Sequence, residues 1–272
     1  MLLLLPPSEG KTPPDDGPPV DLQSLIYPEL AGARQRVLTR LAKVSAQRNA
    51  ARVLGVGDSL SQEVAANTQL LAAPSAPAAE VYTGVLFAAA GLSELNGEPA
   101  RRAAEHVRIF SGLWGALSPA DHIPAYRLSM GVALPGLPKP RAAAAGPVKL
   151  ATYWKQHLAG VLDRGEPGVI VDCRSAAYAA AWKPPAGGAT YASVQVVRER
   201  NGSRTVVSHN AKHARGLLTR HLLTRAGDMP RSAEELATAS EEMCADPQMP
   251  VHGVELHDGP ASRHTLTLIE RG

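Results

Sequence analysis

Three polar residues near the N-terminus have the types and spacing to bind an anion. Ser8, Lys11 and Thr12 follow an apolar run over residues 1–5, which is typical of a buried strand. Hydroxyl and ammonium groups at a strand exit can donate hydrogen bonds to a phosphate. The Gly-Lys-Thr ending is similar to a P-loop, but Leu5 occupies the place of that motif's first glycine. The segment therefore predicts an anion contact without a P-loop, and a solvated lysine is the alternative.

The densest unusual stretch lies between residues 108 and 131. Gly112 and Gly115 bracket a Leu-Trp pair, and glycine lets backbone amides approach a ligand closely. Ser118, followed by proline, predicts the N-cap of a helix whose first amides would also favour an anion. Arg127 can form a bidentate pair with a phosphate or carboxylate. The alternative is a tight structural turn around the tryptophan.

A second group of polar residues follows a later apolar strand. Arg174 and Ser175 come directly after the strand predicted over residues 168–173, and Tyr178 lies one helical turn further on. Strand ends in mixed sheets commonly supply site residues. We therefore include this segment among the candidates for phosphate contacts.

A basic helix is predicted over residues 210–225. Lys212 and Arg215 are three residues apart and so lie side by side on it, which suits a phosphate backbone or a small anion. An ordinary solvated face is the alternative. His209 and His213 have the spacing of a two-histidine metal clamp, but the accompanying glutamate is absent, so no metal site is predicted.

The candidate residues fall into two sets by their chemistry. The side chains that could transfer a proton are Lys11, Tyr82, Ser111, Asp121 and Tyr178. The side chains that could bind DNA or a phosphate are Ser8, Lys11, Thr12, Arg127, Arg174, Ser175, Lys212 and Arg215. For Tyr82 alone a buried core tyrosine is the alternative. The sequence assigns no cofactor.

The elements that must position these residues mix helices with strands. Apolar periodicity and capping signals predict helices over residues 33–53, 61–72, 150–162, 210–225 and 232–243. Apolar or β-branched runs predict strands over residues 1–5, 106–110, 168–173, 190–197, 204–208, 251–256 and 265–269, with a hairpin turn at Asn201-Gly202. This order predicts a mixed α/β (α+β) fold, with one domain over residues 1–272 built on a mixed sheet flanked by helices.

Composition narrows the class of protein. The 272 residues carry a net charge of +3, and 44% of them are hydrophobic, which argues against intrinsic disorder. The apolar opening run is too short for a membrane span or a signal peptide, and two cysteines cannot form a disulfide framework. We therefore expect a cytoplasmic protein without a membrane partner. The small positive excess does not by itself indicate nucleic-acid binding.

Six motifs in order give the chain a family resemblance. They are Ser8-x-x-Lys11-Thr12, Tyr82-Thr-Gly84, Ser111-Gly-Leu-Trp-Gly115, Tyr126-Arg-Leu-Ser-Met-Gly131, Ser175-x-x-Tyr178 and Lys212-x-x-Arg215-Gly216. With them the chain resembles the YaaA family of bacterial cytoplasmic peroxide-stress proteins. The resemblance implies an α/β domain with a basic cleft and a helix-hairpin-helix-like element. It also implies binding of DNA, including branched DNA, and limitation of free iron and oxidative damage during peroxide stress.

The chain departs from the family motifs at three positions. Trp114 replaces a tyrosine, and Ser129 and Ala177 stand where the resemblance implies acidic residues. If the family site uses those acids for a cation or for proton transfer, this chain does something different.

Three functions stay open from the sequence, of which an interaction protein without a pocket ranks lowest. The other two are as follows. One is a non-catalytic DNA-binding stress protein, and the other is an enzyme acting on a phosphorylated small molecule such as a nucleotide or nucleobase derivative. An enclosed cavity holding Lys11, Arg127 and Lys212 would favour the enzyme, whereas an open groove as wide as a duplex would favour DNA.

Overall fold

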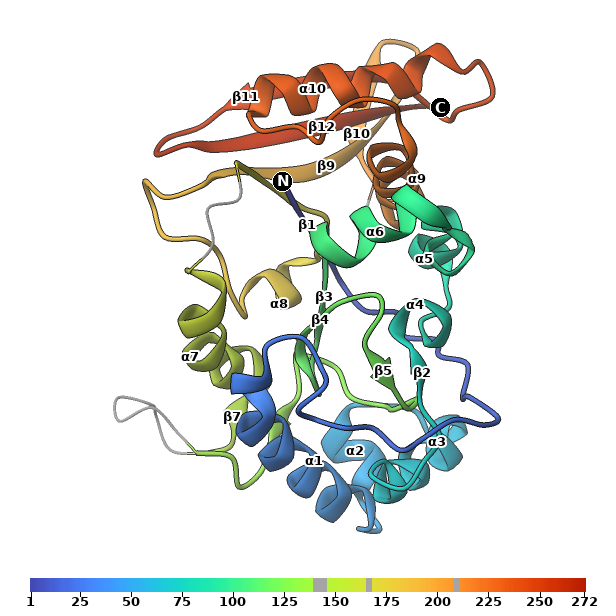
Figure 1. Cartoon of the computed structure of the whole chain (residues 1–272), viewed down its shortest axis with the longest axis vertical. Coiled ribbons are helices and arrows are strands. Elements are labelled where there is room, and N and C mark those ends of the chain that lie inside the picture. Colours follow the sequence, from blue (N-terminus) through green and yellow to red (C-terminus); the bar gives the residue numbers. More distant parts are fainter. Residues whose placement is uncertain (139–145, 165–167, 208–210) are drawn as a thin grey trace.

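A mixed sheet runs through the molecule and orders its other elements (Figure 1). The computed structural model describes residues 1–138, 146–164, 168–207 and 211–272. The strand order is β11-β12-β9-β8-β1-β3-β4, with β10 paired to β9 outside this path. These strands are β1 (Leu2–Leu5), β3 (Val107–Ser111), β4 (Gly115–Leu117), β8 (Val169–Asp172), β9 (Thr190–Arg200), β10 (Ser203–Val206), β11 (Val251–Asp258) and β12 (Arg263–Arg271).

The first strand forms the centre of the sheet because it is apolar on both faces. β1 pairs in parallel with β3 on one side and with β8 on the other, so Leu3 lies opposite both Val107 and Val171. Leu3, Leu4 and Leu5 are fully buried, as a parallel strand covered on both faces requires. The apolar opening run therefore forms the predicted buried strand.

The C-terminal half of the sheet contains the predicted hairpin. β9 and β10 pair antiparallel around Asn201 and Gly202, which have φ values of 50° and 76°. A two-residue turn with both central residues at positive φ matches the right-handed twist of the strands. β12 then pairs in parallel with β9 and antiparallel with β11, so the sheet is mixed as expected.

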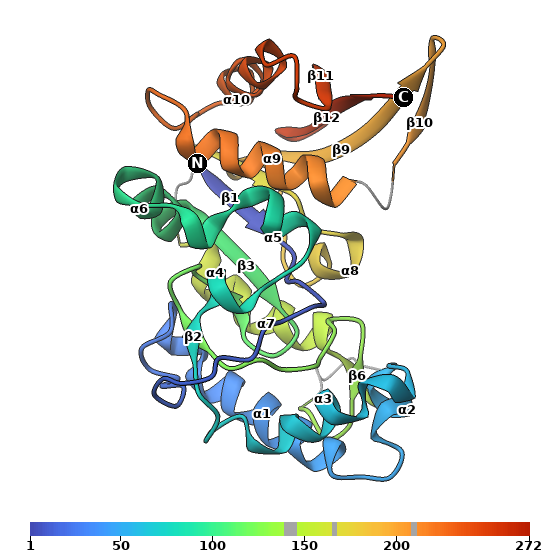
Figure 2. The same cartoon turned by 90° about the vertical axis from the view of Figure 1, so that its right-hand side faces the viewer.

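Helices cover both faces of the parallel strands. Figures 1 and 2 show α5, α6 and α9 on one side of β1 and β3, with α7 and α8 on the other. The helices are α1 (Ala31–Ser45), α2 (Ala50–Leu54), α3 (Ser61–Ala66), α4 (Ala78–Val81), α5 (Val85–Ala90), α6 (Gly97–His106), α7 (Leu150–Leu162), α8 (Ala176–Ala179), α9 (Ala211–Thr224) and α10 (Ala233–Glu241). Short strand pairs join β2 (Ala76–Pro77) to β5 (His122–Ile123) and β6 (Ala133–Leu134) to β7 (Val148–Lys149).

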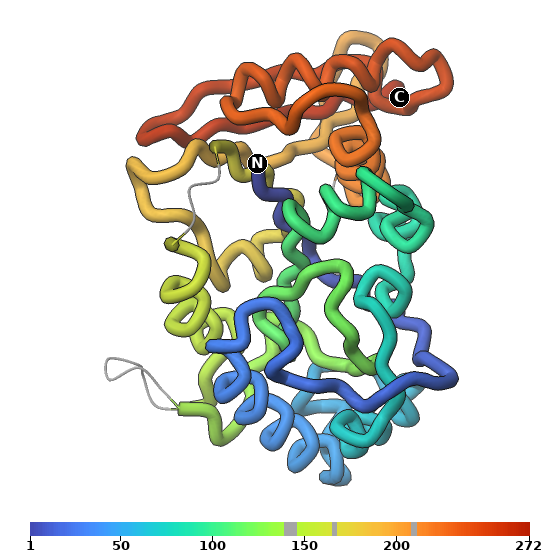
Figure 3. The backbone as a smooth tube through the Cα atoms, viewed as in Figure 1, coloured from blue at the N-terminus to red at the C-terminus, as the bar shows by residue number. Residues whose placement is uncertain are grey.

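The two ends of the molecule come from different parts of the sequence. Figure 3 shows the helices of the first 70 residues gathered at one end and the C-terminal strands at the other. One hydrophobic cluster nevertheless includes residues from Leu3 to Leu268. Among the residues that the structure describes, no helix is both long and apolar enough to span a bilayer.

Three predicted helices differ from the structure. The helix predicted over residues 61–72 is shorter, because α3 ends at Ala66 and a 3₁₀ turn over Asn67–Gln69 follows it. The helix predicted over residues 33–53 is interrupted, because α1 ends at Ser45 and α2 starts at Ala50 after a polar turn. The prediction of a helix that starts at Ser118 is wrong, because a turn is found there. Asp121 accepts a hydrogen bond from the Ser118 amide (2.9 Å) and closes a turn that leads directly into β5.

The glycine-rich motif is a connection between strands. Gly112 and Gly115 lie between β3 and β4, so the helix-hairpin-helix-like element implied by the resemblance is not at this motif. Gly115 has a φ of 76°, and a Cβ there would approach the Trp154 ring to 2.8 Å. The Trp154 Nε1 donates to the Gly112 carbonyl at 2.8 Å. Gly115 therefore allows close packing against the indole, and Gly112 allows close approach of the backbone of residues 128–130.

Candidate functional site

Three chain segments meet where the parallel strands end. The Ser8–Lys11 segment follows β1, Ser111 is the last residue of β3, and Tyr178 lies on α8, shortly after β8. β1 lies between β3 and β8, so the strand order reverses here. Open sheets with parallel strands bind ligands at such a point, beyond the carboxyl ends of the strands.

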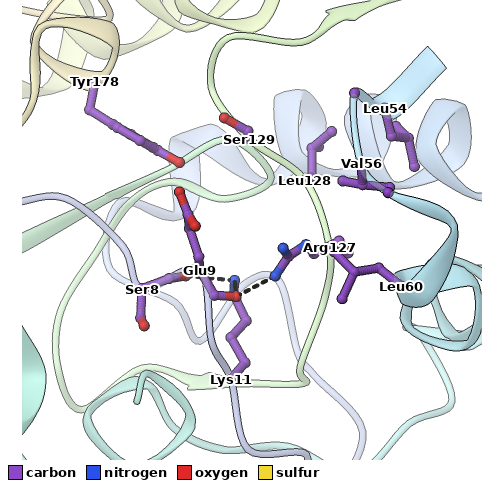
Figure 4. A pocket seen from close by; sticks show the side chains of 12 residues that line it. Ser8, Glu9, Lys11, Leu54, Val56, Leu60, Arg127, Leu128, Ser129 and Tyr178 are labelled. Carbon is purple, nitrogen blue, oxygen red and sulfur yellow. Dashed lines mark hydrogen bonds between the residues drawn. The ribbon is translucent and has the colours of Figure 1, made fainter. Parts of the chain in front are cut away.

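A cavity of about 310 Å³ opens at this place (Figure 4). Its size is at the lower end of the range for small-molecule sites. The segment after β1, the loop between α2 and α3, residues 127–129 and α8 all contribute to its wall. The lining residues are Ser8, Glu9, Lys11, Leu54, Gly55, Val56, Gly57, Leu60, Arg127, Leu128, Ser129 and Tyr178.

Lys11 is one of two basic side chains in the cavity, and its ammonium group has few hydrogen-bond partners. Its Nζ donates to the Ser8 carbonyl at 2.8 Å and lies 3.5 Å from the Glu9 carbonyl. The same atom is 4.4 Å from the centre of the Tyr126 ring, a favourable cation–π distance. Burial of the ammonium group, together with the Arg127 charge, lowers the pKa of Lys11 from 10.5 to about 7. Near neutral pH this amine can therefore gain or lose a proton.

Arg127 supplies the second cation of the cavity. Its Nη1 donates to the Glu9 carbonyl at 2.7 Å and lies 3.5 Å from a Glu63 carboxylate oxygen. Within the described part of the chain, its Nε and Nη2 have no hydrogen-bond partner. Two free N–H groups on one guanidinium match the oxygens of a phosphate or carboxylate.

Glu9, Ser129 and Tyr178 form the polar wall opposite these cations. In Figure 4 the Glu9 side chain extends toward the Tyr178 hydroxyl, while Ser129 lies beside both. Burial raises the pKa of Tyr178, so its hydroxyl keeps its proton at neutral pH and can donate a hydrogen bond. The cavity therefore combines two cations, a carboxylate and a phenol.

A row of three hydroxyl groups lies behind Lys11. The Ser111 Oγ accepts hydrogen bonds from the Leu113 and Trp114 amides, both at 3.1 Å, and these occupy its two lone pairs. Ser111 must then donate to the Tyr126 hydroxyl, 2.6 Å away. Tyr126 in turn donates to the Tyr82 hydroxyl at 2.8 Å. Tyr82 is thus the end of the row that still has a proton to donate.

This row also shows how the predicted backbone amides are used. The Leu113 and Trp114 amides, expected to face an anion, are taken up by Ser111 inside the fold. Burial raises the pKa values of Tyr82 and Tyr126 above their usual range, so both remain protonated. Neither they nor Ser111 lines the first cavity.

Comparison with known proteins places the chain in a family. A family model described as "Peroxide stress protein YaaA" matches residues 1–243. The UPF0246 protein of Streptomyces coelicolor is 43% identical over 247 residues, which cover 89% of this chain and 90% of that protein. The UPF0246 protein of Corynebacterium efficiens is 39% identical over 269 residues, with 99% and 100% coverage. The chain belongs to the YaaA family.

The structure places the two positions where the YaaA resemblance implies acids. Ser129 lines the cavity, so an acid there would add a carboxylate to its wall. Glu9, on the same wall, supplies a carboxylate in this chain. Ala177 is exposed on α8. The loss of one implied acid therefore changes the cavity directly.

Of the last YaaA motif, Lys212 adjoins a smaller cavity of about 190 Å³ and Arg215 does not. Lys212 lines it together with Ser8, Glu9 and Gly84 among others. Ser8 and Glu9 line both cavities, so Lys11 and Arg127 share one cavity as predicted, whereas Lys212 lies at the other. Arg215 faces the sheet instead, where its Nη2 donates to the Val194 carbonyl at 2.7 Å.

Other predicted site residues have structural partners away from the cavity. The Arg174 guanidinium is buried and donates two hydrogen bonds to the Asp172 carboxylate, at 2.6 and 2.8 Å. The same carboxylate accepts a hydrogen bond from the Tyr191 hydroxyl. Asp121 accepts from the Ser118 and Ile26 amides and so fastens two loops. The geometry therefore gives no support to Arg174 as a phosphate ligand or to Asp121 as a proton-transfer group.

Two predicted residues are peripheral. Thr12 is exposed, and its amide donates to the Val81 carbonyl at 3.0 Å. Ser175 is exposed at the start of α8. His209 lies outside the described residues, within which no cluster of three or more potential metal ligands occurs.

Sequence reasoning missed part of the cavity wall. The loop over residues 54–60 contributes only leucine, valine and glycine to the lining, and these types carry no chemical signal. Glu9 was visible between Ser8 and Lys11, but a single acid in a loop is usually solvated. Glu63, which faces Arg127, is on a predicted helix with no motif.

Proposed function

We propose that this YaaA-family protein acts in the peroxide-stress response as an enzyme on a small phosphorylated molecule. One observation carries the proposal: Lys11 and Arg127 lie in the same cavity of about 310 Å³, together with a carboxylate and a phenol. Such a recess suits a small ligand better than the open surface of a duplex. The proposed site of action is the cytoplasm.

The roles follow from the two cations. Arg127 has two free N–H groups to hold a phosphate, and Lys11 has an amine whose pKa is lowered to about 7. A general acid or base is most effective when its pKa is close to the working pH. We therefore assign anion binding to Arg127 and proton transfer to Lys11, with the Tyr178 hydroxyl as a further donor.

DNA binding is the second candidate, and Lys212 favours it. That exposed lysine starts α9 beside the Ser8–Gly10 segment, where a strand of DNA could contact both. Several other surface arginines already pair with carboxylates of this chain, which reduces the charge available to a duplex. They are Arg101, Arg102, Arg204, Arg220 and Arg225. Protection from iron-dependent damage stays a prediction from the family resemblance.

Binding assays on matched variants separate the two candidates. Calorimetry with inorganic phosphate and with AMP should show binding that Lys11→Met or Arg127→Gln weakens about tenfold or more. Lys155→Met, which removes an exposed lysine from α7, should have no effect. The proposal is wrong if neither phosphate compound binds. Fluorescence anisotropy with duplex and branched DNA, measured at about 50 mM and about 200 mM salt, would then identify DNA binding by its steep salt dependence.

A further inference from the structure

A second cavity of about 340 Å³ adjoins the first. Lys11 lines both of them, so its side chain lies between the two cavities. The second cavity is otherwise mostly apolar. Its lining residues are Lys11, Pro13, Pro14, Gln62, Glu63, Ala66, Leu70, Ala73, Pro74, Ala125 and Tyr126.

An ion pair links the two cavities beside Lys11. Arg127 lines the first cavity and Glu63 lines the second, and their side chains approach to 3.5 Å. Positive charge therefore dominates the first side, whereas the only carboxylate lining the second cavity is that of Glu63. Lys11 is common to both cavities, so the first, which also has Arg127, should attract an anion more strongly than the second, where Glu63 offsets the lysine charge.

The second cavity is formed by braced backbone. Pro13, Pro14 and Pro74 fix part of its wall, since proline restricts φ. The neighbouring Ser75 donates to the Pro18 carbonyl from its amide at 3.0 Å and from its hydroxyl at 2.7 Å. This joins the two proline segments to each other. The cavity is therefore preformed, which reduces the entropy lost when a ligand binds.

We propose that the second cavity is the apolar subsite for the same ligand that the first cavity holds by its phosphate. The substrate class is then a phosphate ester with an uncharged, largely apolar group. A volume of about 340 Å³ equals that of roughly eleven water molecules, so it accommodates a group of about ten non-hydrogen atoms. Tyr126 offers a ring for contact, and Gln62 and Glu63 can accept a hydrogen bond from the group's polar edge. This inference rests on the proposed function.

The test compares hexyl phosphate with inorganic phosphate by calorimetry. Hexyl phosphate should bind the wild-type protein about tenfold or more tightly, since its chain leaves water for an apolar wall. Ala66 is exposed and lines the second cavity, so Ala66→Phe fills that space without opening the core. This variant should bind inorganic phosphate as the wild type does and lose the advantage of the hexyl chain.

Ala65→Phe is the matched control. Ala65 is exposed on the same helix and is not among the lining residues, so this variant should retain the advantage of hexyl phosphate. Ala73→Leu, at another lining residue, provides a second filling variant if Ala66→Phe does not fold.

The possible outcomes distinguish the two proposals. If phosphate binds but the hexyl chain adds nothing, or if its advantage survives both filling variants, the subsite is refuted while the proposed function stands. If neither phosphate compound binds the wild-type protein, the proposed function fails first.

Discussion

Two cations inside this molecule have opposite surroundings. The Arg34 side chain on α1 is completely buried, and its guanidinium donates to four backbone carbonyls at 2.6–3.1 Å, those of Ile26, Tyr27, Trp114 and Ala116. The Lys11 ammonium has one carbonyl at 2.8 Å and a second at 3.5 Å, and it faces two cavities.

The difference separates a structural cation from the one to which we assign a proposed function. Arg34 joins the loop before α1 to β4, and no cavity described here reaches it. Burial lowers its pKa to about 10, so it stays charged at neutral pH. Lys11 has a pKa of about 7 and an unused hydrogen-bonding direction. A buried polar group with all its partners stabilises the fold, whereas an incompletely satisfied one at a cavity is available to a ligand.

The largest expected effect comes from Arg34→Met. This change leaves four buried carbonyls without their donor and should reduce the free energy of unfolding by about 3–5 kcal/mol. Urea denaturation measures it. Lys43→Met, at an exposed position of the same helix, should cost about 0.5 kcal/mol or less. A similar loss in both variants would contradict the structural role of Arg34.

A smaller loss of stability is expected for Ser111→Ala. The Leu113 and Trp114 amides lose their acceptor within a buried turn, which should cost about 2 kcal/mol. The same denaturation experiment on Ser129→Ala, an exposed serine of the cavity, should give almost no change. An unchanged unfolding midpoint for Ser111→Ala would show that the amides find other partners.

Lys11→Met should change the pH dependence of stability. The folded pKa of about 7 lies below the ordinary 10.5, so the unfolded chain binds more protons between these values. Stability should therefore rise with pH above 7, by at most about 1.4 kcal/mol per pH unit, and by less because the side chain is partly exposed. Lys11→Met should lack this rise, and Lys155→Met should retain it.

The smallest effect is expected from Glu63→Gln. Glu63 raises the pKa of Lys11, so removing its charge should lower that pKa further. The rise in stability should then begin at a lower pH than in the wild type. Unfolding curves measured from about pH 5 to about pH 9, in steps of about half a pH unit, would reveal this shift. Glu80→Gln, at an exposed position, is the control. A shift toward higher pH would refute the assigned interaction.

Much of the fold could be predicted because local patterns and tertiary structure agree. The apolar run of β1, the Asn201-Gly202 turn and the stripe of α7 each occur where predicted. The prediction at Ser118 failed because a serine-proline pair suits a turn as well as a helix start. The Asp121 side chain, by accepting the Ser118 amide, decides the outcome in favour of the turn.

The site was harder to predict because the same residue types serve both in ligand binding and in buried structural contacts. Lys11, Arg127 and Tyr178 were predicted and do meet in one cavity. Arg174 belongs to the same residue type as Arg127, yet Asp172 holds it inside the protein. Arg34 lies on the same buried stripe of α1 as Val37 and Leu38, but its carbonyl partners come from other segments of the chain. Such long-range partners leave no trace in the local sequence.

The orientation of the Ser111, Tyr126 and Tyr82 hydroxyls affects how well a negative charge is stabilised near them. Ser111, Tyr126 and Tyr82 point their O–H bonds the same way, so their bond dipoles add, with the positive end at Tyr82. Because backbone amides set this polarity during folding, the row does not have to reorient when negative charge develops near it. The row therefore acts as a permanent, uncharged source of positive potential behind Lys11, and deprotonation of that amine leaves it intact.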